Sequence, residues 1–304
     1  MISFQIGPAT VTRVEEVLER GFDPAQALPG FDPALFERYP ILAGPDYFDR
    51  ASGKLMSSIQ SWLIRLDGKT ILVDTCSGNG KARALPVFQR FHMLDLPYLD
   101  NLAKAGVRPE DVDIVFNTHL HIDHVGWNTR REGDRWVPTF PNARYLFGRA
   151  EYEHWTTGPG PSRMPQNIDV IADSVLPIVE TGRAEFVDPG DVIAPGLMVE
   201  AAPGHTAAQL NLRYTAPDGE SFLVSADVMN QPIQIYAPEI NSWFCEEPEV
   251  ARATRRRVLE SCADTGALLL PTHFGYPHAG YVRRDGDGFR FEPATPADEA
   301  AAAA

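Results

Sequence analysis

The sequence predicts an α/β protein. Short apolar runs rich in Val, Ile, Leu and Phe, which are typical of buried strands, alternate with segments of helical spacing along most of the 304 residues. The strand-rich segments fall into two halves, and helices follow each half. At 44% hydrophobic and 22% charged residues, the composition is that of an ordinary globular protein. The length is sufficient for an ample core.

In the first half of the chain, the opening strand is expected at residues 9–17, where apolar residues alternate. The Asp67-Gly68 turn joins the next two strands, 58–66 and 69–75, in a hairpin that places Asp74 at a sheet end. A helix is expected between Pro97 and Gly106. The remaining elements expected in this half are strands at 112–116 and 143–147, a helix beginning at 149, and a helix over 167–179.

In the second half, apolar runs predict strands at 197–202, 210–214, 221–225 and 267–270, followed by a hairpin of 281–284 and 289–292. Residues 248–263 have helical spacing, with Pro248 at the start and Gly266 just past the end. The basic run 255–257 in this helix is expected on a solvated face. The Ala-, Glu- and Pro-rich tail, 293–304, is expected to be disordered, so residues 1–292 would form a single domain.

Residues 20–54 form an unusual segment. They are rich in Pro and Gly but also carry large apolar side chains, among them Phe22, Phe31, Tyr39 and Phe48, which a disordered linker would not hold. Two interpretations remain open. The segment is either a loop packed over the core, or an arm or lid that borders the functional site or exchanges with a second subunit in a homodimer.

Charge and cysteine content restrict the function classes. The formal net charge of −14 argues against nucleic acid as a partner and disfavours an anionic membrane surface. The three cysteines, Cys76, Cys245 and Cys262, are widely separated, which argues against a disulfide framework. The first residues lack the basic start and long apolar run of a signal peptide, and no stretch approaches a membrane span. We therefore expect a cytoplasmic protein with a small-molecule partner.

A cluster of metal donors follows the strand expected at 112–116. Three imidazoles and one carboxylate lie within six positions, on a segment that favours a loop: His119, His121, Asp123 and His124. Imidazole nitrogen and carboxylate oxygen are donors that zinc prefers. Three more donors follow turns or apolar strands farther along the chain: His205 in a Pro-Gly turn, Asp227 after 221–225, and His273 after 267–270.

These motifs together resemble the metallo-β-lactamase superfamily of hydrolases, and the resemblance covers roughly residues 59 to 280. It implies a four-layer αβ/βα sandwich with two zinc ions per chain. The residues that match the ligand positions divide into three groups: His119, His121 and His205 for one zinc, Asp123, His124 and His273 for the other, and Asp227 as a bridge between them. Asp74 resembles the strand-terminal aspartate that supports the site without binding metal.

The resemblance implies that a metal-bridging hydroxide cleaves an ester or lactone of a small, partly apolar molecule, with Asp123 and Asp227 as the catalytic carboxylates. The alternatives are a dizinc hydrolase of phosphotriesters or activated aromatic substrates, an iron-dependent oxidoreductase of the same fold, and a non-catalytic zinc-stabilised binding protein. His121 argues against the diiron flavoprotein relatives, which have glutamate there. A closed structural zinc site needs only four ligands, so the larger donor set disfavours the binding protein.

Residues 227–234 resemble the branch that contains lactonase-like and organophosphate-hydrolase-like enzymes. Asn230 stands where quorum-quenching lactonases commonly have tyrosine. Large side chains near the donors would line either a substrate pocket or the core: Trp127, Trp155, Met229, Phe244 and Tyr276. The remaining histidines, His92, His154 and His278, match no ligand position and are expected to have structural or surface roles.

Overall fold

The computed structural model describes residues 1–296. Contacts between residues group the chain into two compact units, each assembled from separate stretches of sequence. The first unit comprises Met1, Ala9–Val17 and Ile59–Asp191, and the second comprises Ile2–Pro8, Leu18–Ser58 and the chain from Val192 onward. The single domain expected over 1–292 stays a prediction.

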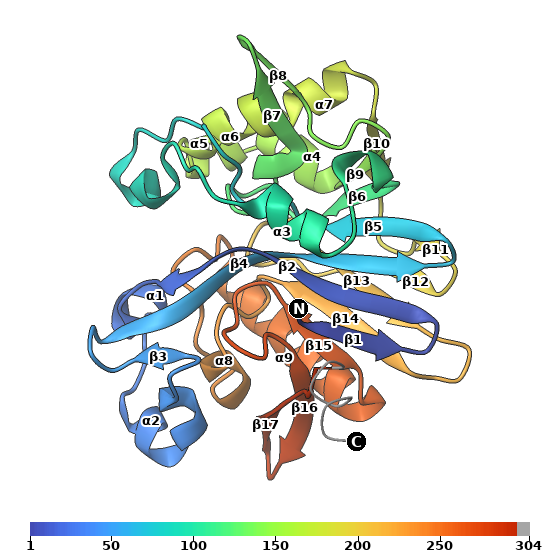
Figure 1. Cartoon of the computed structure of the whole chain (residues 1–304). Helices are drawn as coiled ribbons and strands as arrows, with labels where there is room; N and C mark the ends of the chain where they lie inside the picture. Colours follow the sequence, from blue (N-terminus) through green and yellow to red (C-terminus); the bar gives the residue numbers. More distant parts are fainter. Residues whose placement is uncertain (297–304) are drawn as a thin grey trace. The chain divides into compact units, whose positions relative to one another are not determined.

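The first unit holds most of an eight-stranded sheet, in which six strands follow in the order β2 (Ala9–Arg20), β4 (Lys54–Leu66), β5 (Lys69–Val73), β6 (Ile114–Asn117), β9 (Arg144–Gly148) and β10 (Ala184–Val187). The expected hairpin is confirmed, because β4 and β5 pair antiparallel. Strands β5, β6, β9 and β10 then run parallel, and Figure 1 shows β5 in pale blue and β6 and β9 in green. The carboxyl ends of β5 and β6 therefore meet at one edge of the sheet.

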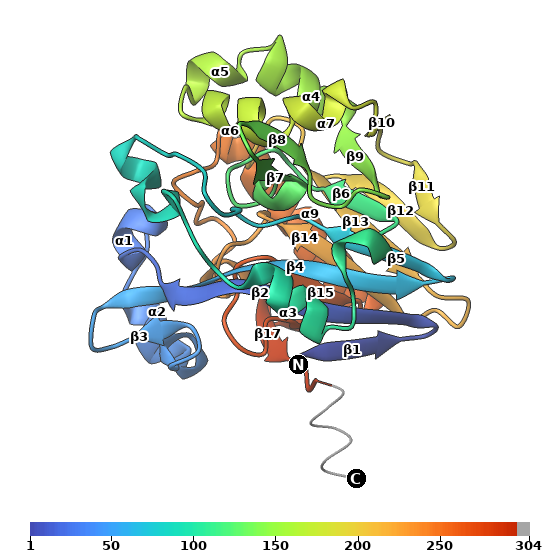
Figure 2. The same cartoon turned by 45° about the horizontal axis from the view of Figure 1, so that its top comes forward.

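The other elements of the first unit are α3 (Tyr98–Lys104), α4 (Arg149–Thr156), α5 (Gly160–Arg163), α6 (Asn167–Ser174), α7 (Leu176–Glu180), the 3-10 turns η2 (Pro86–Phe91), η3 (Pro109–Asp111) and η4 (Gly126–Asn128), and the hairpin β7 (Thr129–Glu132) and β8 (Arg135–Pro138). Helix α4 packs against β9 and α6 (Figure 2). The helix expected over 167–179 is two helices. Pro177 lacks a backbone N–H to continue the first one, and the chain bends at Val175.

The sheet of the second unit runs in the order β11 (Val192–Ala194), β12 (Leu197–Ala201), β13 (Leu210–Thr215), β14 (Ser221–Ala226), β15 (Leu268–Pro271), β16 (Gly280–Asp285) and β17 (Gly288–Pro293). Neighbouring strands are antiparallel except for β14 and β15, which are parallel. The carboxyl ends of β14 and β15 therefore also meet at one sheet edge.

The other elements of the second unit are β1 (Ser3–Ile6), α1 (Pro24–Ala27), α2 (Ala34–Arg38), η1 (Pro40–Ala43), β3 (Phe48–Asp49), α8 (Ile233–Tyr236) and α9 (Pro248–Thr265). Helix α9 packs against β14 and β16 and ends at Gly266, whose φ of 68° is accessible to glycine at little cost. Within residues 1–296, none of the helices has both the length and the apolar character needed to cross a membrane.

The basic run of α9 differs from the expectation. Arg256 and Arg257 are exposed, but Arg255 is completely buried. Its guanidinium donates to the backbone carbonyls of Val228, Pro238 and Ile240 at 2.8–2.9 Å. Burial lowers the pKa of Arg255 to about 10. Spacing alone cannot distinguish an arginine that satisfies buried carbonyls from one that faces water.

The segment 20–54 packs onto its own unit. Leu28 and Leu42 of this segment are buried in an apolar cluster with Leu55, Ile233 and Ile240. These side chains therefore pack within the second unit, and the choice between a packed loop and a lid or dimer arm stays a prediction.

The ordered chain extends slightly beyond the expected boundary at 292. Pro293 ends β17, and the amide of Ala294 donates to the carbonyl of Ala279 at 3.1 Å. The rest of the tail expected to be disordered, from residue 297, lies outside the described residues.

Candidate metal centre

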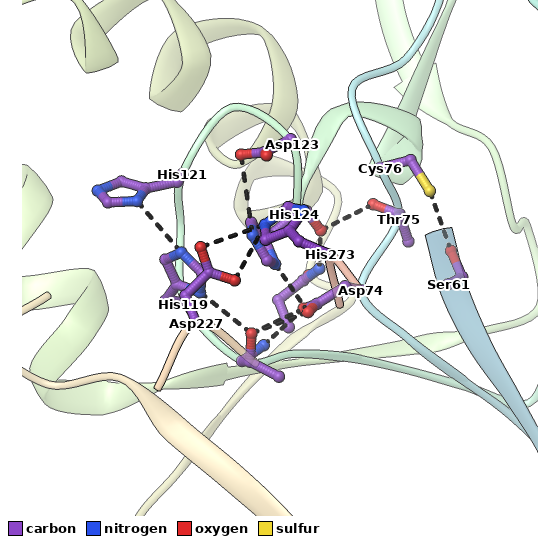
Figure 3. Close-up of polar contacts among 12 residues, drawn as sticks. Ser61, Asp74, Thr75, Cys76, His119, His121, Asp123, His124, Asp227 and His273 are labelled. Atoms are coloured by element: carbon purple, nitrogen blue, oxygen red, sulfur yellow. Dashed lines mark hydrogen bonds and ion pairs between the residues drawn. The ribbon is translucent and has the colours of Figure 1, made fainter. Parts of the chain in front are cut away.

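The loop after β6 brings four predicted donors together in the first unit. The side chains of His119, His121 and His124 are buried, and Asp123 is partly exposed. Nε2 of His119 lies 3.2 Å from Nδ1 of His121, and the rings of His119 and His124 are 3.9 Å apart between centroids. Nε2 of His124 lies 3.8 Å from Oδ1 of Asp123 (Figure 3). The motif therefore forms one compact donor set.

Asp74 orients this set from the end of β5. Its Oδ2 lies 2.8 Å from Nδ1 of His124 (Figure 3). Its Oδ1 accepts the backbone N–H of Thr118 at 2.8 Å. A carboxylate only accepts, so we assign the proton of His124 to Nδ1, which directs the lone pair of Nε2 toward the donor set. Ligating histidines commonly donate their other ring N–H to such a carboxylate. Asp74 therefore supports the site as the resemblance implies.

Thr118 assigns the tautomer of His119 in the same way. The hydroxyl of Thr118 lies 2.9 and 3.1 Å from the two oxygens of Asp74 and donates to this carboxylate. The hydroxyl is then left as an acceptor for Nδ1 of His119, 3.1 Å away. The proton of His119 is accordingly on Nδ1, and its Nε2 is a donor atom for a metal.

Buried polar groups of α4 and α6 fix the backbone of the loop. Glu151 accepts the amide of Leu120 at 3.2 Å and the indole N–H of Trp155 at 2.7 Å. The side-chain amide of Asn167 donates to the carbonyl of Leu120 at 2.9 Å. The ring of Trp155 lies 5.5 Å from that of His121, edge to face. Trp155 thus belongs to the support of the loop, and Glu151 and Asn167 are supporting residues that the sequence did not reveal.

The second unit brings the other three predicted donors together. Nε2 of His273 lies 3.1 Å from Oδ1 of Asp227, and Nε2 of His205 lies 3.3 Å from Oδ2 of the same carboxylate. Asp227 and His273 follow the parallel pair β14 and β15, whose shared edge accounts for their proximity. All three side chains are buried.

Two contacts orient these donors. Nδ1 of His273 lies 2.8 Å from the carbonyl oxygen of Ser58, so this nitrogen carries the proton and Nε2 is left as the donor atom. The side-chain amide of Asn230 donates to Oδ2 of Asp227 at 2.8 Å. Asn230 was singled out in the sequence only as a substitution for tyrosine, and its contact with Asp227 is a finding of the structure.

The distances within each set fit a tetrahedral zinc ion. Ligand atoms about 2.0–2.1 Å from zinc at tetrahedral angles are about 3.3 Å from one another. Three separations within the two sets are 3.1–3.3 Å, and the separation between Nε2 of His124 and Oδ1 of Asp123 is 3.8 Å. The tautomer assigned to His119 leaves its Nε2 without a hydrogen. The distance of 3.2 Å from this nitrogen to Nδ1 of His121 is therefore compatible with a cation that both rings bind. The residues of each set therefore fit a metal-binding site.

Three other predicted side chains have structural contacts. The indole N–H of Trp127 donates to Glu16 at 2.8 Å, and its ring belongs to the buried core of the first unit. Met229 is fully buried in the core of the second unit. His278 donates from Nδ1 to the carbonyl of Phe274 at 2.7 Å, in keeping with the structural role expected for it.

The family model of the metallo-beta-lactamase superfamily matches residues 57–273, which is more than half of the chain. The chain belongs to this superfamily. Among curated proteins, the N-acyl homoserine lactonase AttM of Rhizobium radiobacter is 28% identical over 135 residues, covering 42% of this chain and 46% of that protein. An N-acyl homoserine lactonase of a Bacillus species is 24% identical over 126 residues, covering 41% and 42%. The matches thus span less than half of the length of these relatives.

Solved structures agree over nearly the whole chain. The hydrolase AbOPH of the beta lactamase superfamily superposes with a TM-score of 0.79 at 22% identity, covering 97% of both chains. AidC, a dizinc quorum-quenching lactonase, superposes with a TM-score of 0.77 at 20% identity, covering 96% of this chain and 97% of that one. At such identities the likeness concerns the fold. The predicted α/β fold of the metallo-β-lactamase type is confirmed.

Proposed function

We propose that the chain is a dinuclear zinc hydrolase that cleaves an ester or lactone of a small, partly apolar molecule. The observation that carries this proposal is the set of contacts that fix the tautomers of three histidines. In His119, His124 and His273, Nδ1 donates to a neighbouring oxygen, and Nε2 is left as a metal-donor atom. Such a hydrogen bond from the second ring nitrogen is typical of histidines that bind metal and is not needed for histidines on the surface.

In the proposed centre the two donor sets share two zinc ions. His119, His121 and His205 would hold one ion, Asp123, His124 and His273 the other, and Asp227 would bridge them. When bound, the zinc ions supply a water molecule whose pKa lies near neutrality and stabilise negative charge that develops on the substrate. Membership of the superfamily and the dizinc description of AidC support this arrangement.

The carboxylates of the chain have separate tasks in this proposal. Asp227 is buried, and its Oδ2 accepts the side-chain amide of Asn230 at 2.8 Å. Asp123 is more exposed, with 18% of its side chain accessible. In this proposal the carboxylate of Asp123 would take a proton from the attacking water and return it to the leaving alkoxide.

The substrate class rests on the relatives. The curated proteins matched in sequence are lactonases, and AidC was solved with the product N-hexnoyl-L-homoserine. Asn230, in place of the tyrosine common in quorum-quenching lactonases, indicates that the preferred lactone or ester is not the one those enzymes take. Phosphotriesters remain the second candidate, because the same nucleophile can attack phosphorus. A homodimer and a cytoplasmic location stay predictions.

Elemental analysis of the purified protein, together with hydrolysis of a panel of lactones, aryl esters and a phosphotriester, tests the proposal. Two zinc ions per chain with lactone or ester turnover would support it. Turnover of the phosphotriester alone would favour the second candidate. One iron per chain and no hydrolysis would contradict the proposal and favour an oxidoreductase.

A variant pair links turnover to the donors. His121→Ala should abolish hydrolysis and lower the zinc content while the chain stays folded. His92→Ala is the matched control, because His92 is exposed and accepts the amide of Arg83 at 3.0 Å within the first unit. Unchanged activity of His121→Ala would rule out the metal-dependent mechanism.

A further inference from the structure

A buried carboxylate lies behind the donor loop of the first unit. Glu16 of β2 is only 3% exposed and accepts three N–H groups: the backbone amides of Ser77 and Gly78 at 2.9 and 3.0 Å, and the indole of Trp127 at 2.8 Å. Burial raises the pKa of this carboxyl above its usual value, and the N–H donors oppose the shift. A glutamate this deeply buried is uncommon unless its oxygens are satisfied.

The segment that Glu16 holds has unusual backbone geometry. Asp74 and Cys76 have φ angles of 57° and 49°, in the left-handed region that non-glycine residues adopt only at some cost, and Gly78 has a φ of 77°. Such a conformation persists only when surrounding contacts determine it. The two consecutive amides that donate to Glu16 immediately follow the two strained residues.

This strained segment is in direct backbone contact with the donor loop. The amide of Thr75 donates to the carbonyl of His124 at 2.7 Å, and the amides of Gly126 and Trp127 donate back to the carbonyls of Cys76 and Thr75, each at 2.7 Å. A Cβ on Gly126 would lie 1.9 Å from the backbone of Ser77, so the two stretches touch without room for a side chain. Any shift of the segment is therefore transmitted to His124.

Glu16 also holds the far end of the donor loop. Trp127 follows the motif by three residues, donates to the carboxylate, and stacks on the ring of Tyr98 at 5.4 Å between centroids. One side chain thus fixes both stretches that flank His124, the segment with Asp74 on one side and Trp127 on the other. In the sequence Glu16 is one of two adjacent glutamates of the opening strand, and nothing distinguishes it.

We propose that Glu16 is a positioning residue of the metal centre, which sets the place of Asp74 and of His124 through the strained segment 74–78. The inference rests on the proposed function in that the loop must bind zinc. The inference goes beyond the proposed function because it assigns a role to Glu16, whose hydrogen bonds are to Ser77, Gly78 and Trp127 and to none of the seven donors.

Glu16→Gln is the direct test. All three groups that Glu16 accepts are donors, so a glutamine amide would oppose at least one N–H with its own N–H₂. Glu15→Gln is the matched control, because it makes the same chemical change one residue earlier, where the side chain is 40% exposed and pairs with Arg13. Zinc affinity would be measured by competition with a chromogenic chelator, at a temperature well below the melting temperature of each variant.

We expect Glu16→Gln to weaken zinc binding by about 10- to 100-fold, the range known for partners that orient ligands. Glu15→Gln should bind zinc like the wild type. The visible absorption spectrum of the cobalt-loaded protein should also change for Glu16→Gln, because displaced ligands alter the field at the metal. A merely structural role would lower the melting temperature of Glu16→Gln but leave affinity and spectrum unchanged in the folded protein, and this result would overturn the inference.

A milder variant keeps the test decisive if Glu16→Gln does not fold. Trp127→Phe removes one of the three donors and preserves an aromatic ring against Tyr98, so the inference expects a smaller but measurable loss of zinc affinity, roughly threefold to tenfold. Wild-type affinity in this variant would count against the inference. If the wild-type protein itself binds no zinc, the proposed function is wrong. If the wild type binds zinc and the zinc affinities of Glu16→Gln and Glu15→Gln are equal, only the inference about Glu16 is contradicted.

Discussion

Asp74 shows how one carboxylate can determine what a neighbouring histidine does. It fixes the proton of His124 on Nδ1 and also accepts the amide of Thr118, at the start of the donor loop. Asparagine has nearly the same shape but only one acceptor oxygen. If its amide nitrogen faces His124, the histidine must take the other tautomer, and Nε2 then carries a hydrogen and cannot bind metal.

We therefore expect Asp74→Asn to lower zinc affinity by about 10- to 100-fold, measured by competition with a chelator. Asp113→Asn is the control. Asp113 likewise accepts a backbone amide, that of Thr70 at 2.9 Å, but it lies at the opposite end of strands β5 and β6. Equal zinc affinity in the two variants would show that Asp74 does not set the tautomer.

Lys81 provides a prediction about pH. Its side chain is completely buried, with Nζ 2.9 Å from the hydroxyl of Thr129, 3.4 Å from Asp173 and 3.8 Å from the ring centre of Trp136. Burial lowers the pKa of Lys81 from 10.5 to about 8, against the opposing effect of Asp173. Between these two values the unfolded chain holds a proton that the folded chain has released, so the contribution of Lys81 to stability rises with pH in this window.

We expect the wild type to gain roughly 1–3 kcal/mol in free energy of unfolding, relative to Lys81→Met, between about pH 7.5 and about pH 10. Urea unfolding of both proteins at several pH values measures the difference, in which the titration of all shared groups cancels. A constant or falling difference would contradict the lowered pKa.

The seven donors were predicted from the sequence because each follows a strand end or turn in a recognisable order. Their supporting contacts were not predictable in the same way. Asn230 and Glu151 are ordinary polar residues in sequence, and the partner of His273 is a backbone carbonyl, Ser58, that no residue type announces. Such contacts depend on segments up to 215 positions apart in the chain.

At the level of elements, helix α9 anchors the stretch that follows Asp227. Arg255 donates to the carbonyls of Val228 and Ile240, and Gln234 of α8 donates to the same carbonyl of Ile240 while it accepts the amide of Asn230. Helices α8 and α9 thus both contact the stretch that contains Asn230, which donates to Asp227. The strand and helix positions of this half were largely predicted by periodicity, whereas the burial of Arg255 depends on which carbonyls lie beneath the helix.

Arg255→Met should lower the free energy of unfolding by about 3 kcal/mol, because it leaves buried carbonyls without donors. Arg256→Met, one position along the same helix, alters an exposed residue that pairs with Glu260, and should change stability by about 0.5 kcal/mol or less. Urea unfolding compares the two variants. Similar small losses would mean that water replaces the guanidinium at the carbonyls.

At the level of the whole molecule, the two units have a common construction. In each, a pair of parallel strands, β5 with β6 and β14 with β15, ends at the sheet edge from which donors project. The sequence places donors after strands, but it does not say which strands are neighbours, because pairing is decided by contacts between distant segments. The structure supplies that information.

The proposed sharing of two zinc ions by donors from both units leads to the final prediction. If one centre uses both sets, His121→Ala and His205→Ala each damage the same zinc site, so the double variant should lose little more zinc than either single variant. If each set bound metal independently, the losses would add. Elemental analysis after dialysis against a zinc buffer measures the zinc content of the four proteins, including the wild type.

The melting temperature of each protein, with and without a chelator, provides the control: wild type should be stabilised by zinc through mass action, and the two single variants should lose that stabilisation to the same extent. Additive losses of zinc would mean that the two donor sets bind metal independently, which contradicts the dinuclear centre. Non-additive losses would mean that both sets belong to one site.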